Sequence, residues 1–166
     1  MRVLVTGAAG SGTSTFAHAL AAKMQAAWLE ADDFLWLPTQ PPYSQLRSPI
    51  DRSAHFLDAF QKQSDSVVAG SVMGWGADVE EAFDTIVFLF APTAVRLERL
   101  NRRETERFGR VDPKFLEWAA QYDVGPSEGR SLAKHTAWLA ARKCPIVRLD
   151  GSVPVADLLT QFAAQP

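Results

Sequence analysis

Directly after the apolar run at residues 3–5, the chain reads Gly7-Ala8-Ala9-Gly10-Ser11-Gly12-Thr13-Ser14-Thr15. These small residues let successive backbone N–H groups close around a polyphosphate, and a helix that begins here directs its positive end at the same anion. The spacing matches the phosphate-binding loop G-x-x-x-x-G-K-[ST] except at the lysine, which Thr13 replaces. We therefore expect residues 7–15 to bind ATP, with the Ser14 hydroxyl as a ligand of Mg²⁺.

The missing lysine leaves the β- and γ-phosphates without their usual ammonium partner. Six of the twelve arginines lie between residues 96 and 110, in a segment predicted to be a helix from Pro92 onward. Four of them fall along one helix face, namely Arg96, Arg99, Arg103 and Arg107. Because a guanidinium makes forked contacts to phosphate oxygens, this face is predicted to replace the lysine.

We assign catalytic roles on this basis to Arg99, Arg103 and Arg107. The acids interspersed at residues 98, 104 and 106 leave an alternative open. On that alternative, the arginines form only a solvated surface of ion pairs.

Acidic residues follow the second strand-like run, at Glu30, Asp32 and Asp33. In an open α/β sheet the carboxyl ends of the strands meet at the ligand-binding edge, so these side chains should lie beside the glycine loop. Ionised carboxylates there could hold Mg²⁺ or accept the proton of an attacking hydroxyl. Asp32 and Asp33 are predicted to be catalytic and Asp32 also to bind metal, unless the two merely cap the next turn.

Strand-like runs occur at residues 2–6, 27–30, 66–70, 85–90 and 146–150, with helix-like stretches between them. This alternation predicts an α/β fold with a parallel sheet covered by helices. Ser48 and Pro49 predict a helix start, with Ile50, Leu57 and Phe60 facing inward. The segments 37–47 and 108–129 are rich in proline or glycine and are candidate mobile flaps over the site.

The length and composition of the chain exclude several classes of protein. A chain of 166 residues that is 47% hydrophobic is expected to form one domain, 1–166. A net charge of −2 argues against nucleic-acid binding, and the absence of a long apolar run predicts a cytoplasmic protein that does not bind membranes. The single cysteine, Cys144, and three scattered histidines predict structural roles and no metal site of their own.

A rival interpretation of the glycine loop is a dinucleotide site, because residues 6–12 also resemble the T-G-x-x-G-x-x-G opening of short-chain dehydrogenases. The third glycine would then have to be Thr13. Neither Tyr43 nor Tyr122 is followed by the lysine of the Y-x-x-x-K arrangement. NAD(P) binding therefore stays a remote alternative.

The glycine loop, the acids after the second strand, Gly70-Ser71 after the third, and the run from Phe88 to Arg99 together resemble the adenylate-kinase-like P-loop kinases. The resemblance covers nearly the whole chain, and is strongest to kinase-like proteins labelled adenylate kinase or AAA family ATPase. It implies a three-layer αβα fold with five parallel strands in the order 2-3-1-4-5. It also implies an acceptor-binding flap at about residues 34–49 and a lid at about residues 104–129, and it makes Arg103 and Arg110 nucleotide contacts.

That resemblance implies a monomeric kinase that transfers the γ-phosphoryl group of ATP to a nucleotide or another small-molecule acceptor. The candidate acceptor contacts are Arg52, Gly70, Ser71, Trp75 and Arg130, and core packing is an equal alternative for Trp75. The missing lysine keeps a second possibility open, a nucleotide-binding switch, pseudokinase or ATPase that has no phosphoryl acceptor.

Overall fold

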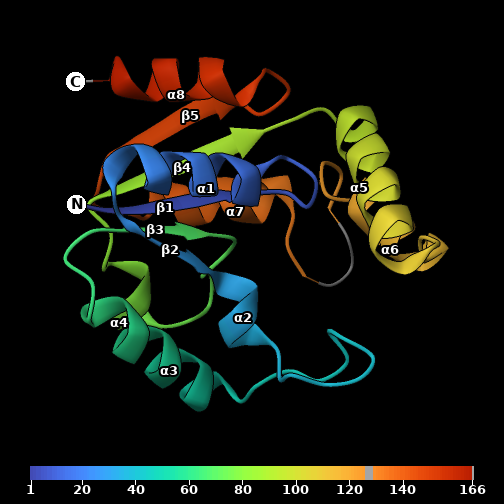
Figure 1. The fold of residues 1–166 in the computed structure, drawn as a ribbon, viewed down its shortest axis with the longest axis horizontal. Helices are drawn as coiled ribbons and strands as arrows, with labels where there is room; N and C mark the ends of the chain where they lie inside the picture. Colours follow the sequence, from blue (N-terminus) through green and yellow to red (C-terminus); the bar gives the residue numbers. More distant parts are fainter. Residues whose placement is uncertain (126–128, 166) are drawn as a thin grey trace.

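The computed structural model describes residues 1–125 and 129–165. Five strands form one parallel sheet in the order β2-β3-β1-β4-β5 (Figure 1). The strands are β1 (Arg2–Gly7), β2 (Ala27–Glu30), β3 (Ser66–Ala69), β4 (Thr85–Phe90) and β5 (Ile146–Asp150). The predicted fold class and strand order are confirmed. The order differs from the 3-2-1-4-5 arrangement of the classic dinucleotide-binding fold, which argues against the dehydrogenase alternative.

Eight helices occupy the described part of the chain. They are α1 (Thr13–Met24), α2 (Ala31–Leu35), α3 (Pro49–Gln61), α4 (Ala77–Glu80), α5 (Thr93–Phe108), α6 (Pro113–Ala120), α7 (Leu132–Ala140) and α8 (Val155–Ala163). No helix among the described residues is both long enough and apolar enough to cross a membrane.

The two faces of the sheet are covered by different helices, since successive residues of a strand point to opposite sides. Val3 and Val5 of β1 pack against α1 and α8, whereas Leu4 between them packs against α3, α4 and α7 (Figure 1). Both faces of β1 are therefore dry. The glycine loop consequently follows a strand that is packed on both sides.

Helix α3 begins as predicted, because the Ser48 side chain accepts a hydrogen bond from the Asp51 N–H at 3.1 Å. The expectation that Ile50 faces inward is wrong, since its side chain is 82% exposed. Ile50 lies in the first turn, before the helix reaches the sheet. The buried anchors of α3 are Phe56 and Phe60, whose rings stack with centroids 5.0 Å apart.

Phe56 is the centre of an aromatic cluster that joins α3 to the segment after β3. Its fully buried ring lies 5.4 Å from that of Phe34 and 5.6 Å from that of Trp75, both edge to face. We expect Phe56→Ala to lower the free energy of unfolding by about 4 kcal/mol, because it removes apolar contacts and leaves a cavity. Urea denaturation measures this loss. The exposed Phe108 provides the control, and an equal loss in Phe108→Ala would contradict the packing argument.

A buried polar pair lies on the same side of the sheet, where the Tyr122 hydroxyl is 2.6 Å from His135 Nδ1. Burial, assisted by the charge of Arg130, lowers the pKa of His135 from 6.5 to about 4. Below pH 6.5 the unfolded chain binds a proton at His135, whereas the folded protein does so only near pH 4. The free energy of unfolding therefore keeps its full contribution from neutral His135 above pH 6.5 and loses it as the pH falls toward 4.

The cost of keeping His135 neutral should amount to about 2 kcal/mol between pH 6.5 and pH 5. We expect His135→Gln to be less stable than the parent at neutral pH but to lose less stability on acidification. The free energies of unfolding of both proteins, measured at pH 6.5 and pH 5, give the change in stability with pH for each. The difference between the two changes reports on His135, because the other titrating groups are common to both proteins. Parallel slopes would show that His135 binds its proton as readily in the folded protein as in the unfolded chain.

Candidate functional site

The five strands end at one edge of the sheet, and the loops that follow them form the candidate site. The glycine loop follows β1, the acids follow β2, and Gly70 follows β3. Helices α5 and α6 lie side by side beyond this edge, on the right of Figure 1. The parallel sheet thus brings together three groups that lie far apart in the sequence.

The glycine loop has the backbone of an anion-binding cradle. Gly12 caps α1 in the left-handed region, with φ of 95°, and supplies no capping side chain. A Cβ on Gly7 would lie 2.4 Å from the Leu89 carbonyl oxygen, so only glycine fits between loop and strand. In the described chain, the first-turn N–H groups of Thr13, Ser14 and Thr15 have no backbone acceptor. They are free to bind phosphate oxygens.

Glu30 is the last residue of β2, and its carboxyl lies close to the Ser14 side chain. Burial raises the pKa of Glu30 to about 7, with Ser14 opposing the shift and the charges of Asp32 and Asp33 adding to it. Its Oε1 atom is buried and has no hydrogen-bond partner among the described residues. Sequence reasoning grouped Glu30 with Asp32 and Asp33 but assigned it no role of its own.

Asp32 and Asp33 occupy the first turn of α2, a short helix that the sequence did not predict. Within residues 1–125 and 129–165, neither side chain caps a backbone N–H, which argues against the capping alternative. Burial raises the pKa of Asp32, while the nearby positive charges of Arg130 and Arg103 oppose that shift. The fold therefore brings the Asp32 carboxyl near two arginines, Arg103 and Arg130, that the sequence analysis assigned to the site.

The remaining arginines of α5 have separate environments. Arg99 donates from Nη1 to the Gly151 carbonyl at 2.7 Å, and the same atom lies 3.7 Å from where a Cβ on Gly12 would be. Arg107 donates to the Tyr43 hydroxyl at 3.3 Å. Arg110 is exposed in the loop before α6. Of Arg99, Arg107 and Arg110, Arg99 is therefore the one that adjoins the glycine loop.

Arg96 does not belong to the exposed face on which the sequence placed it. Its side chain is fully buried, whereas Arg103 and Arg107 are exposed. The step of three residues from Arg96 to Arg99 turns Arg96 toward the buried side, which it shares with Leu100 four residues later. Arg96 is consequently unavailable to a phosphate from the solvent side.

A cavity of about 300 Å³ lies under the predicted flap. The flap is mostly irregular and is closed at its base by an antiparallel bridge between Trp36 and Leu46. The lining includes Asp32, Asp33, Trp36, Pro42, Tyr43 and Arg47. Trp36, Tyr43 and Arg47 were missed as site residues, although aromatics among closely spaced prolines could have suggested a binding loop.

The predicted acceptor contacts after β3 are packed more tightly than expected. Trp75 is only 6% exposed, and the Arg52 guanidinium lies 4.7 Å above its ring while donating to the Gly74 carbonyl. Of the two equal alternatives for Trp75, core packing describes its position, and a contact with an acceptor stays a prediction. Ser71 is half-buried and accepts a weak hydrogen bond from the Met73 N–H.

Gly70 acts as a spacer in this structure. Its φ is +113°, and a Cβ on it would lie 2.9 Å from the Cβ of Ala31, the first residue of α2. A larger residue at position 70 would push α2 away from the sheet. Gly70 thereby sets the position of Asp32, one residue further along α2.

The donor set beside the glycine loop suits Mg²⁺, the metal that this fold implies. Mg²⁺ prefers oxygen ligands, retains several waters and uses only one or two carboxylates. Ser14 supplies a hydroxyl, and the unpaired buried oxygen of Glu30 lies beside it. Among the described residues, no cluster of three or more His, Cys, Asp or Glu side chains could hold a metal. A metal here would consequently depend on phosphate oxygens and water for its other ligands.

Residues 3–112 match the family described as AAA domain. The chain belongs to this AAA domain family. An uncharacterized protein of Bacillus subtilis (strain 168), YqaC, is 32% identical to this AAA domain protein over 163 residues. The match covers 92% of this chain and 90% of YqaC.

Solved kinases share the fold of the AAA domain protein. Shikimate kinase from Bacteroides thetaiotaomicron has a TM-score of 0.64 and 14% identity, over 98% of this chain and 96% of the kinase. A sugar kinase from Janibacter has a TM-score of 0.57 and 21% identity, over 97% and 91% of the two chains. Deoxyadenosine kinase from M. mycoides has a TM-score of 0.58 and 10% identity, over 98% and 97%. The AAA domain protein therefore has a P-loop kinase-like fold.

Proposed function

We propose that this protein binds Mg²⁺-ATP in the glycine loop and transfers the γ-phosphoryl group to a hydroxyl of a small-molecule acceptor. The observation that carries the proposal is the juxtaposition of three features at one sheet edge. They are the open N–H groups at the start of α1, the carboxyls that follow β2, and the cavity under the flap. The kinase fold of the solved neighbours supports the same reaction class.

Each group has a role in this proposal. The N–H groups of residues 12–15 bind the β- and γ-phosphates, and Ser14 with Glu30 or Asp32 holds the metal. Bound Mg²⁺ supplies charge neutralisation on the phosphate oxygens. Asp32 adjoins both the cavity and Arg103, so it can accept the proton of an acceptor hydroxyl while the arginine stabilises the transferred group.

The acceptor is proposed to occupy the cavity beneath residues 34–49. Trp36 and Tyr43 offer apolar ring surface there, and Asp32 and Asp33 line the same cavity. Such a mixture of aromatic walls and a few polar groups is typical of small-molecule sites. Action as a cytoplasmic monomer, with a lid at about residues 104–129, stays a prediction from the sequence. Residues 126–128 of that lid lie outside the described residues.

The second candidate function is a nucleotide-binding switch, pseudokinase or ATPase without an acceptor. Thr13 favours it, because the loop then binds phosphates without the cation that normally stabilises their developing charge. A single-turnover assay with ATP labelled in the γ-phosphate separates the functions. A labelled organic product supports the kinase, labelled inorganic phosphate alone supports the ATPase, and retention of label in ATP supports the switch.

Nucleotide binding itself is tested by Ser14→Ala. Loss of the hydroxyl should weaken ATP binding about tenfold in the presence of Mg²⁺, since a hydrogen bond or ligand contact to a charged group is removed. Binding without Mg²⁺ should change little. Calorimetry with and without the metal measures both affinities. The control is Ser64→Ala, because Ser64 is exposed just before the amino end of β3, away from the site. Equal weakening under both conditions would contradict the metal role of Ser14.

A further inference from the structure

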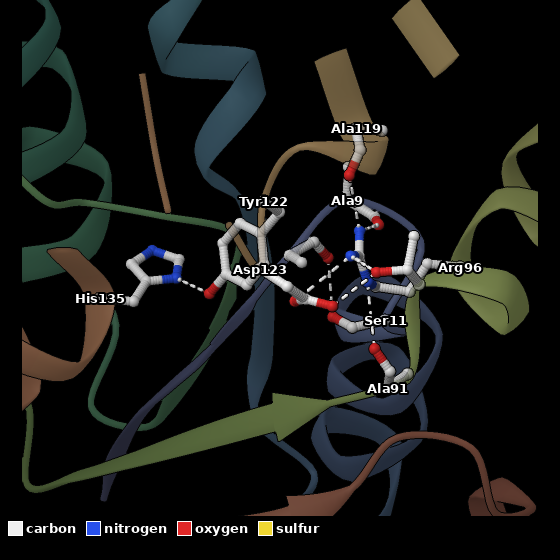
Figure 2. A network of polar contacts seen from close by, with 10 residues as sticks. Ala9, Ser11, Ala91, Arg96, Ala119, Tyr122, Asp123 and His135 are labelled. Atoms are coloured by element: carbon white, nitrogen blue, oxygen red, sulfur yellow. Dashed lines mark hydrogen bonds and ion pairs between the residues drawn. The ribbon is translucent and has the colours of Figure 1, made fainter. Parts of the chain in front are cut away.

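Arg96 is the largest fully buried side chain of the described chain, and it lies directly behind the glycine loop. A buried guanidinium is tolerated only when its N–H groups find acceptors, because burial removes its water. Figure 2 shows the Arg96 guanidinium among carbonyl and side-chain oxygens of the labelled residues. Those acceptors show which segments of the chain the Arg96 side chain holds together.

The acceptors come from three separate parts of the chain. Nη1 of Arg96 donates both to the Ala9 carbonyl of the glycine loop, at 3.4 Å, and to the Ala119 carbonyl of α6, at 3.0 Å (Figure 2). Nε donates to the Ala91 carbonyl after β4, at 3.1 Å. One nitrogen atom thus joins the predicted phosphate cradle to the helix that lies beyond the sheet edge.

The second terminal nitrogen binds the segment that follows α6. Nη2 of Arg96 donates to Thr93 Oγ1 at 2.9 Å and lies 3.5 Å from a carboxylate oxygen of Asp123. Thr93 donates in turn to the other oxygen of Asp123. The planar fork of an arginine suits such a simultaneous arrangement, which a single ammonium point charge does not reproduce.

The glycine loop also rests on the backbone of Arg96. A Cβ on Gly10 would lie 2.6 Å from the Arg96 carbonyl oxygen and 3.0 Å from its Cα. Since no free space separates the loop from this turn of α5, a displacement of the loop must move Arg96 or break its contact with Ala9. Arg96 therefore contacts the loop through both its backbone and its side chain.

The network continues from Arg96 toward the acids of the site. The Tyr122 ring lies 5.3 Å from the Arg96 guanidinium, and the Tyr122 carbonyl accepts the N–H of Leu132 at 2.9 Å. Leu132 comes two residues after Arg130, whose charge acts on Asp32. Contacts therefore lead from the loop at Ala9 through Arg96 and Tyr122 to Leu132 at the start of α7.

We propose that Arg96 is a positioning residue that couples phosphate binding in the glycine loop to the placement of α6 and the following segment, residues 113–124. It does so without touching the nucleotide. The inference rests on the proposed nucleotide binding by residues 7–15. It extends that proposal by assigning a role to an arginine that the phosphate-binding face does not include.

Hydrogen exchange of residues 113–124 tests the coupling, with Mg²⁺ and the non-hydrolysable ATP analogue adenylyl imidodiphosphate as the probe. In the parent, the analogue should slow exchange of these amides about tenfold, within the usual range of coupling between sites. Arg96→Met keeps a long side chain but removes every donor. The analogue should still bind it, as measured by calorimetry, but should leave exchange of residues 113–124 unchanged.

Arg102→Met is the matched control, because Arg102 is exposed on the same helix. It should show the full protection of the parent. Asp123→Asn removes only one partly exposed partner of Arg96 and should give an intermediate protection. This variant decides the question if Arg96→Met does not fold, and protection equal to that of the parent would then overturn the coupling.

The outcomes separate the inference from the function on which it rests. Binding of the analogue to the parent without protection of residues 113–124 overturns the coupling alone. Full protection in a folded Arg96→Met variant does the same. Failure of the parent to bind the analogue in calorimetry overturns the proposed nucleotide binding and the coupling together.

Discussion

Arg103→Met should lower phosphoryl transfer by about 10³-fold, the lower end of the losses seen when an arginine that stabilises the transferred group is removed. The charge of the Arg103 guanidinium opposes the rise in the pKa of Asp32, so the two groups attract each other across the proposed site. Affinity for ATP should change far less, because the backbone cradle is untouched. Single-turnover transfer from labelled ATP measures the rate, and calorimetry measures the affinity.

Arg102→Met removes the same charge one residue earlier and should behave like the parent. Thr13→Lys tests the idea from the opposite direction. If arginines already supply the missing cation, an added lysine should increase the rate little or impair it through crowding of like charges. A gain of orders of magnitude in Thr13→Lys, with Arg103→Met equal to the parent, would instead identify a nucleotide-binding protein that has lost its catalytic cation.

Asp32→Asn should reduce turnover by about 10²-fold or more, which is the usual contribution of a general base. The substitution preserves shape and removes the charge that Arg130 and Arg103 face. ATP should still bind, since the nearest metal donors, Ser14 and Glu30, are retained.

Asp33→Asn in the same turn separates a specific role from a general loss of negative charge. It should have the smaller effect, because the charges of Arg130 and Arg103 are found acting on Asp32. Asp58→Asn, on the exposed side of α3, is the neutral control. Unchanged turnover in both Asp32→Asn and Asp33→Asn would remove these carboxyls from the proposed mechanism.

The strands could be predicted from the sequence because each is a short apolar run between turn residues. Runs such as Thr85–Phe90 are buried on both faces of the sheet and therefore carry a continuous apolar signal. The glycine loop was equally visible, since each of its glycines meets a local backbone demand. Gly12, for example, must adopt a positive φ to begin α1.

The parts that sequence reasoning missed depend on long-range contacts. The acceptors of Arg96 are backbone carbonyls as distant as Ala9 and Ala119, and no residue pattern reports where a carbonyl points. Trp75 carries no signal that distinguishes a binding platform from a packed ring covered by Arg52. Helix α2 was missed because five residues are too few to show a helical period.

The hydrogen bond between Arg107 and Tyr43 has a consequence for the timing of catalysis. It joins the last turn of α5 to the flap beside the proposed acceptor cavity, and both side chains are exposed. A hydrogen bond between exposed partners contributes about 1 kcal/mol, which favours the joined arrangement by only about five to one. The flap would then separate from α5 for roughly a sixth of the time. Acceptor entry is therefore expected to be limited by diffusion and collision with the cavity, and not by waiting for a rare opening.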